Sequence, residues 1–200
     1  PSEMEGKSEF NLGVLGPGTG LGIGGLLGRN GQIYPIAGEG SHQGFAPETR
    51  TQQKVVRTLR QRYERVTDER LVSGPGLENI YRTLCEIRGK QAAGITTAEI
   101  FSRVLAAEDE IAVEATQLFY EALGQIAGNL TMMLSAYDGI YLAGGIVKRY
   151  PDLLKSSDFR ACFENKGRHR SLMEKVPTSL ILHPQPGLLG ASYIARELFR

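Results

Sequence analysis

The stretch that decides the fold covers residues 11–37 and reads NLGVLGPGTGLGIGGLLGRNGQIYPIA. Its first segment, NLGVLG (11–16), is an apolar run that ends in Gly-Pro-Gly-Thr-Gly, which is typical of a strand entering a tight turn. The second segment, LGIGGLLGR (21–29), alternates small and large residues and leads into an Asn-Gly pair at 30–31, a strong hairpin signal. Residues 32–37 supply the returning strand, so the stretch predicts a three-stranded antiparallel meander.

Helical and strand patterns alternate along the rest of the chain, which predicts the α/β class. The longest helical pattern contains Gly124 and Gly128, four residues apart, which favours a face for close packing. Thr96 with Glu99 forms a capping box that starts another helix. We expect one domain over residues 11–200, preceded by a disordered or residual linker over residues 1–10. The expected helices cover 52–63, 77–87, 96–105, 110–137, 159–163 and 187–199; short strands are expected at 71–76 and 178–183, and a strand, a glycine turn and a helix start at 139–147.

Composition narrows the classes of function. Hydrophobic residues make up 41% of the 200 positions, which is enough for a packed core. The 23 Lys and Arg against 22 Asp and Glu give a net charge of +1, so nothing predicts a nucleic-acid or membrane-surface partner. No apolar run approaches the roughly 18 residues of a spanning helix, and the first ten residues lack the apolar stretch of a signal peptide. These features predict a soluble, cytoplasmic protein without a membrane partner.

Cysteine and histidine give no sign of a metal site. Cys85 and Cys162 are the only cysteines, too few for a disulfide framework or a Cys-rich zinc site. The three histidines, His42, His169 and His183, lie in unrelated segments without ligand spacing. We therefore expect no protein-ligated metal.

The segment GPGTGLG (16–22) is the sharpest local motif. Backbone amides freed by glycine can converge on a phosphate, and the hydroxyl of Thr19 can add one more donor. The glycines also match G-x-G-x-x-G over residues 20–25, but that run reads as a strand and no helix follows, as a dinucleotide fold would need. Taken alone, the motif fits phosphate binding and a plain tight hairpin equally well.

Two polar segments fit a polyol ligand. GEGSH (38–42) places Glu39 and His42 three residues apart in a glycine-rich turn, where they can hydrogen-bond to hydroxyls. Glu69, in Asp-Glu-Arg before a predicted strand, has the same capability. The alternative for both segments is an ordinary solvated loop or helix end.

Two further motifs have weak specificity on their own. LAGGIV (142–147) combines a strand, a glycine pair and a helix N-terminus, which lets a nucleotide approach the backbone but also occurs for packing alone. The basic cluster of Lys166, Arg168 and Arg170 has no interleaved aromatic residues, so a solvated face is the expected structure.

Taken in order, six segments make the chain resemble the bacterial-type glucokinases, from about Leu12 to the C-terminus. They are GPGTGLG (16–22), GEGSH (38–42), DERLVSGPGLENIY (68–81), LAGGIV (142–147), FRACFENKGR (159–168) and PGLLGA (186–191).

The resemblance implies the actin-like, ribonuclease-H-like α/β fold of sugar kinases and ATP-dependent phosphorylation of glucose. It further implies Mg²⁺ bound through ATP, a homodimer and a cytoplasmic location. By position, Glu39, His42 and Glu69 would contact glucose hydroxyls. Gly18, Thr19 and Gly20 would form a phosphate-binding turn, and Gly144 and Gly145 would belong to the adenosine region.

The chain departs from the family pattern at one important point. The family begins with an Asp-x-Gly-Gly-Thr phosphate motif, and its small lobe supplies an Asn-Asp pair whose Asp is the catalytic base; neither motif occurs in this sequence. Together with a first residue, Pro1, that is not Met, this predicts the large C-terminal lobe without its partner. Such a lobe would be inactive alone, and it would expose apolar residues of the terminal helix at Leu188, Leu189 and Ile194.

Two alternative functions remain at this stage. One is a kinase for another hexose or for an N-acyl hexosamine. The other is a non-catalytic sugar sensor derived from a kinase lobe. A repressor would need a DNA-binding helix-turn-helix and a basic face, and the sequence shows neither.

Overall fold

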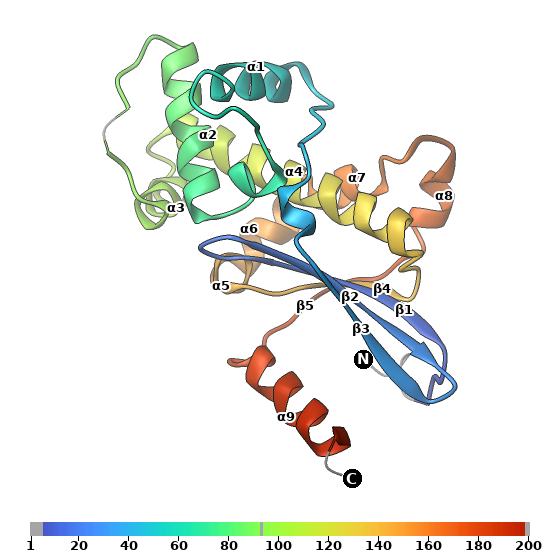
Figure 1. Cartoon of the computed structure of the whole chain (residues 1–200). Coiled ribbons are helices and arrows are strands. Elements are labelled where there is room, and N and C mark those ends of the chain that lie inside the picture. Colours follow the sequence, from blue (N-terminus) through green and yellow to red (C-terminus); the bar gives the residue numbers. More distant parts are fainter. Residues whose placement is uncertain (1–5, 93, 199–200) are drawn as a thin grey trace.

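The computed structural model describes residues 6–92 and 94–198. Residues 1–5 of the predicted linker and Phe199 of the predicted terminal helix lie outside the described residues. Figure 1 shows a five-stranded sheet with the long helix α4 crossing above it and the C-terminal helix α9 on the opposite side. Among the described helices, none is long and apolar enough to cross a membrane.

The predicted antiparallel meander is confirmed. Strands β1 (Phe10–Pro17), β2 (Leu21–Arg29) and β3 (Gln32–Gly38) pair in that order, each antiparallel to the next. Asn30 and Gly31 connect β2 to β3 with φ values of 52° and 75°. Asn and Gly tolerate this left-handed region, and the resulting turn matches the twist of the two strands.

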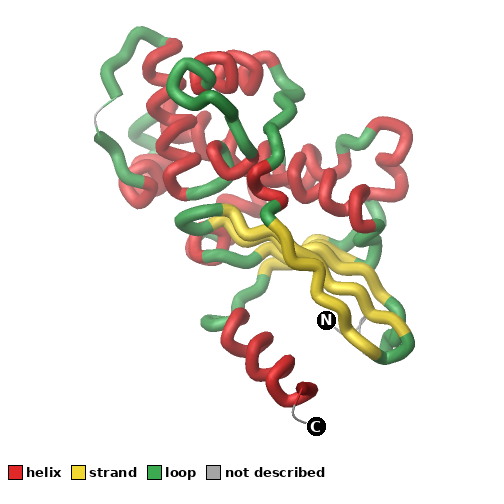
Figure 2. The backbone as a smooth tube through the Cα atoms, in the orientation of Figure 1, coloured by secondary structure: helices red, strands yellow, loops and turns green. Residues whose placement is uncertain are grey.

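Two later strands extend the sheet on the other side of β1. β4 (Gly139–Leu142) pairs parallel with β1, and β5 (Thr178–Leu180) pairs parallel with β4, so the order is β3-β2-β1-β4-β5. Figure 2 shows strands of the sheet side by side in yellow. β5 is shorter than the predicted strand over 178–183. Because β1 and β4 are parallel neighbours, the turn after β1 and the turn after β4 lie at the same edge of the sheet.

The helices cover most of the remaining chain. Both Thr49 and Thr96 form capping boxes, with Gln52 and Glu99 respectively, and the second of these confirms the sequence prediction. α4 ends at Leu134, three residues before the predicted end, with Ser135 in the left-handed region. The helices are α1 (Arg50–Leu59), α2 (Gly74–Ile87), α3 (Thr97–Ala106), α4 (Glu110–Leu134), α5 (Gly145–Arg149), α6 (Pro151–Ser156), α7 (Phe159–Glu164), α8 (Arg170–Met173) and α9 (Pro186–Leu198), with 3₁₀ turns η2 (Gly40–His42), η3 (Asp68–Arg70) and η4 (Gly167–His169).

The predicted strand over residues 71–76 is wrong. Residues 71–73 connect η3 to α2 and residues 74–76 begin α2, whose N-cap Ser73 accepts a hydrogen bond at Oγ from the N–H of Gly76 at 2.9 Å. Pro75 fits the first turn of a helix because its missing N–H is not needed there. The Gly-Pro-Gly sequence therefore starts a helix and does not form a turn after a strand.

The predicted close packing at the two α4 glycines is confirmed. A Cβ at Gly124 would lie 2.1 Å from the carbonyl oxygen of Phe159, and one at Gly128 would lie 2.6 Å from that of Phe163. Both carbonyls belong to α7, so the glycines let the α7 backbone approach α4 directly. Phe163 is fully buried in the resulting core.

The basic cluster is solvated only in part. Arg168 and Arg170 are exposed, but the Lys166 side chain is 10% exposed and its Nζ lies 3.8 Å from Oε1 of Glu48. The aliphatic part of Lys166 covers Gly128, where a Cβ would meet its Cε at 2.5 Å. The expectation of a solvated face is therefore wrong for Lys166, because the long side chain packs along α4.

Candidate functional site

The Gly-Thr-Gly turn, residues 18–20, joins β1 to β2 at one edge of the sheet. The N–H of Gly18 donates to the carbonyl of Gly20 at 2.7 Å, and the carbonyl of Gly18 accepts from the N–H of Gly74 at 2.8 Å. The turn is thus attached to the first residue of α2. Thr19 is exposed, and its hydroxyl makes no hydrogen bond to any described residue, so it is free to contact a ligand.

The turn after β4 packs directly against the end of β1. The N–H of Ala143 donates to the carbonyl of Leu15 at 2.7 Å. Gly144 has a φ of +95°, and a Cβ at this position would lie 2.3 Å from the carbonyl oxygen of Pro17. Only glycine satisfies both constraints, so the connection from β4 to α5 lies against the residue that precedes Gly18.

A cavity of about 260 Å³ opens where these turns meet α3, α5 and the start of α6. Two predicted cofactor residues, Gly18 and Gly145, line it; Thr19, Gly20 and Gly144 lie one or two positions from them in the sequence but do not line it. The structure thus brings two glycine motifs, more than 120 positions apart, to one cavity. The lining residues are Gly18, Thr97, Ala98, Phe101, Gly145, Ile146, Arg149 and Tyr150.

The walls of this cavity combine aromatic, aliphatic and cationic groups. The rings of Phe101 and Tyr150 stack with centroids 4.1 Å apart and an interplanar angle of 23°. Ile146 is partly buried, and Arg149 supplies a positive charge. Such a site can hold a planar ring against apolar surface and pair an anion with the guanidinium.

Sequence reasoning missed the side chains contributed by α3 and by the α5–α6 junction. The only available signal was the capping box at Thr96, which places the start of α3 but not its neighbours. In the structure the N–H of Thr97 donates to Oε1 of Glu78 at 2.9 Å, and its Oγ1 donates to the carbonyl of Gly74 at 2.9 Å. These contacts join α3 to α2 and bring Thr97 to the cavity.

Glu39 is the N-cap residue of the 3₁₀ turn η2 just after β3, and His42 is the last residue of that turn. Nε2 of His42 lies 3.9 Å from Oε2 of Glu39, and the two side chains are 58% and 87% exposed respectively. Ser41 between them is buried, which fixes the turn. Both predicted sugar residues are therefore on the surface, within reach of each other and of a ligand.

Glu69, on η3, is held against the Gly-Thr-Gly turn. Its Oε2 accepts a hydrogen bond from the N–H of Leu21 at 2.9 Å. A Cβ at Gly20 would lie 2.5 Å from the same oxygen, so glycine is required there for the carboxylate to approach. No described residue donates to Oε1 of Glu69, which leaves that oxygen available for a further hydrogen bond.

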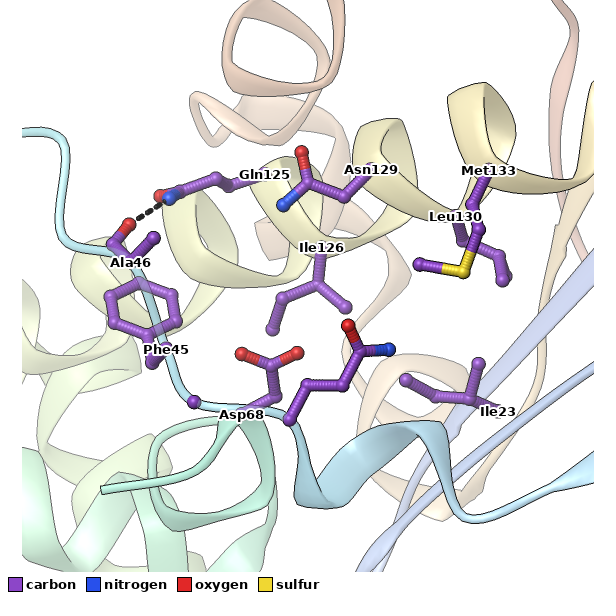
Figure 3. Close-up of a pocket in the computed structure, with 11 residues that line it drawn as sticks. Ile23, Phe45, Ala46, Asp68, Gln125, Ile126, Asn129, Leu130 and Met133 are labelled. Atoms are coloured by element: carbon purple, nitrogen blue, oxygen red, sulfur yellow. Dashed lines mark hydrogen bonds between the residues drawn. The ribbon is translucent and has the colours of Figure 1, made fainter. Parts of the chain in front are cut away.

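Asp68, the residue before Glu69, has different neighbours and lines a small cavity beside α4. It is 9% exposed and its carboxyl points toward Ile126 of α4, as Figure 3 shows. Burial raises the pKa of this carboxyl to about 7. Sequence reasoning treated the Asp-Glu-Arg segment as one charged stretch and did not separate these two carboxyl groups.

The described residues contain no group of three or more His, Cys, Asp or Glu side chains arranged to hold a metal ion. This part of the chain therefore offers no preformed metal centre of that kind.

Comparison with known proteins points to one family. A family model described as Glucokinase matches residues 2–198. The glucokinase of Xylella fastidiosa (strain 9a5c) is 43% identical over 188 residues, which cover 94% of this chain and 55% of that protein. The chain thus spans about half the length of the curated relatives it matches.

Solved structures show the same likeness. The crystal structure of a glucokinase from an Antarctic psychrotroph matches with a TM-score of 0.87 and 29% identity, covering 93% of this chain and 58% of that one. A ROK family glucokinase from Streptomyces griseus, solved in complex with glucose and AMPPNP, matches with a TM-score of 0.63 and 18% identity, covering 96% and 62%.

Proposed function

Since the chain belongs to the glucokinase family and has the actin-like fold of its sugar kinases, we propose that the protein containing it phosphorylates glucose with ATP. The γ-phosphoryl group of ATP passes to the 6-hydroxyl of glucose. This chain contributes the nucleotide cavity and a set of polar side chains for the sugar.

One observation supports this function most directly: the Gly-Thr-Gly turn borders both ligand regions. Gly18 at one end lines the cavity of about 260 Å³. Gly20 at the other end packs against the carboxylate of Glu69, which is bonded to Leu21. Phosphoryl transfer needs the terminal phosphate aligned between nucleotide and acceptor, and a turn shared by both sites provides that alignment.

In this proposal the cavity takes the nucleoside part of ATP. Tyr150 and Ile146 provide apolar surface for the base, and the open backbone at Gly145 allows close approach. Arg149 pairs with a phosphate. The hydroxyl of Thr19 and the turn amides contact the phosphate nearest the sugar, and Mg²⁺ binds through the phosphates of ATP.

The sugar lies against η2 and η3. Glu39 and His42 hydrogen-bond to hydroxyl groups of glucose, and Oε1 of Glu69 accepts a hydrogen bond from one hydroxyl while Oε2 keeps the hydrogen bond that the N–H of Leu21 donates. This arrangement ties the sugar position to the phosphate turn. Hydroxyl recognition by carboxylates distinguishes a sugar from an apolar acceptor.

The catalytic base lies outside these residues in this proposal. The 200 positions contain no Asp-x-Gly-Gly-Thr segment and no Asn-Asp pair. The carboxylates of Glu39 and Glu69 are assigned to binding, not to proton removal. A cytoplasmic location and homodimer formation are further parts of the proposal, which rest on the family alone.

The test uses the whole protein, with one variant on the ATP side of the Gly-Thr-Gly turn and one variant on the glucose side. Thr19→Ala should lower kcat or raise the KM for ATP and leave glucose affinity near wild type. Glu69→Gln keeps an acceptor for Leu21 but removes the charge, and a charge-assisted hydrogen bond of roughly 1.5–3 kcal/mol converts to about a tenfold or greater loss of glucose affinity. Glu174→Gln, at an exposed position paired with Arg170, is the control.

A coupled assay for glucose 6-phosphate and titrations with glucose and ATP measure these effects. Loss of glucose binding in Thr19→Ala with normal ATP handling would show that the turn faces the sugar. Unchanged glucose affinity in both Glu69→Gln and Glu39→Gln would remove the sugar assignment.

A further inference from the structure

A small cavity of about 60 Å³ lies behind η2 and η3, against one face of α4 (Figure 3). We call it the Asp68 chamber. It has room for a few water molecules, and it is separate from the larger cavity that Gly18 and Gly145 line. Its lining residues are Ile23, Gln43, Gly44, Phe45, Ala46, Asp68, Gln125, Ile126, Asn129, Leu130 and Met133.

Among the residues that the structure describes, Asp68 is the only ionisable side chain that lines the chamber. The polar side chains that face it are neutral amides: Gln125 and Asn129 from α4, and Gln43 from the end of η2. The amide nitrogen of Gln125 is already bonded to the carbonyl of Ala46. In the described part of the chain, no hydrogen bond or ion pair reaches the Asp68 carboxyl.

A buried carboxylate without a partner is unfavourable, so the neutral form is favoured here. Burial accordingly raises the pKa of Asp68 to about 7. Near neutral pH the group therefore changes between a neutral carboxyl, which suits the chamber, and an anion, which needs water.

The backbone of Asp68 connects the two sugar-facing segments. Its N–H donates to the carbonyl of Gln43, the residue after His42, at 3.0 Å. Gly44 and Thr67 form an antiparallel bridge just beside this bond. Glu69 follows Asp68 directly. A displacement of the Asp68 backbone would therefore also displace Glu69 and the segment that contains His42 and Gln43, which are the two sides of the proposed sugar site.

Resting on the proposed function, we propose that Asp68 is a positioning residue for sugar binding. As a neutral carboxyl it keeps Glu69 and η2, which contains His42, in the relative positions that sugar binding needs. As an anion it draws water into the chamber and disturbs these positions, so sugar affinity falls.

The size of the effect follows from the fraction of neutral Asp68. With a pKa of about 7, that fraction is near 0.9 at pH 6 and near 0.1 at pH 8. If only the neutral form binds, the apparent Kd for glucose is the intrinsic value divided by this fraction. The Kd should therefore rise about tenfold from pH 6 to pH 8, while kcat at saturating glucose changes much less.

The test compares the whole protein with Asp68→Asn and with the control Asp152→Asn, whose carboxylate is 94% exposed on α6. Glucose Kd is measured by calorimetry at pH 6, 7 and 8, and kcat and KM by the coupled assay. Asp68→Asn retains Glu39, His42 and Glu69, so any pH dependence from these groups stays in all three proteins. The tenfold part of the rise that Asp68 causes should persist in Asp152→Asn and be absent from Asp68→Asn.

A second measurement needs no variant: the ¹³C shift of the Asp68 carboxyl in the wild-type protein should titrate with a midpoint near pH 7. A midpoint below 5, or an equal pH dependence in Asp68→Asn, would overturn the role of Asp68. The role of Asp68 would also be wrong if the pH dependence of the glucose Kd were present in a buffer with tetramethylammonium as its cation and absent when K⁺ replaced that cation. In that case a K⁺ ion bound in the chamber would neutralise the Asp68 anion. Absence of glucose binding at every pH would instead overturn the proposed function, and with it this role.

Discussion

Replacement of Gly144 by alanine tests the junction that builds the nucleotide cavity. The φ of +95° with a ψ of 154° belongs to a region that is nearly restricted to glycine, and strain there is of order 1–3 kcal/mol. The added Cβ would also lie 2.3 Å from the carbonyl oxygen of Pro17, so β1 or the turn must shift, which costs about 1–3 kcal/mol more. We expect a loss of about 4 kcal/mol, or roughly 8–16 °C in Tm.

Gly145→Ala is the matched control, because a Cβ at this position meets no atom within 4 Å. Thermal and urea unfolding of the 200-residue chain, followed by circular dichroism, measures both variants. Gly145→Ala should unfold within about 0.5 kcal/mol of wild type, as expected of a substitution that disturbs no packing. If Gly144→Ala were equally stable, the close contact between the β4–α5 turn and Pro17 would be wrong, and so would the geometry of the cavity.

Two further outcomes follow from the same structure. The purified 200-residue chain should form no glucose 6-phosphate in the coupled assay with an intact glucokinase as positive control; turnover near the control rate would mean that a base exists within these residues. The apolar side chains of α9, of which Leu188 is 66% and Ile194 39% exposed, should make the chain self-associate, because exposed patches of this kind favour association. Leu188→Ser with Ile194→Ser should shift sedimentation toward monomer, and identical behaviour of wild type and variant would remove α9 from the contact.

The local parts of the fold could be predicted from the sequence because their signals are local. The Asn-Gly pair at 30–31 fixes the β2–β3 hairpin, and Thr96 with Glu99 fixes the start of α3. The segment over 71–76 failed because its apolar residues fit a strand and a helix entry alike. Ser73, whose Oγ accepts from the N–H of Gly76, and Pro75 in the first turn of α2 are the local signals of a helix entry, and the prediction took the Gly-Pro-Gly sequence as a turn after a strand.

The sequence predicted the glycine motifs of the candidate site but not the cavity that they line together. Glycines at 18 and 145 are visible in the sequence, and the structure brings them to one cavity because β1 and β4 are parallel neighbours. The partners from α3 and from the α5–α6 junction, such as Thr97 and Tyr150, carry no local signature. Their place follows from how helices pack, which spacing along the chain does not encode.

The two halves of the proposed site differ in how much a ligand must still organise. The Gly-Thr-Gly turn is already held by a hydrogen bond from Gly74 to its Gly18 carbonyl, and Leu21 just after it donates to Glu69, so a phosphate would meet a turn that needs little further ordering. Glu39 and His42, by contrast, are exposed side chains 3.9 Å apart, and their hydrogen bonds to a sugar would compete with water. Strong sugar recognition therefore requires something to cover this side and exclude water, which is the role that lobe closure has in enzymes that sequester their substrates. It follows that glucose affinity should depend more on the rest of the protein than nucleotide affinity does.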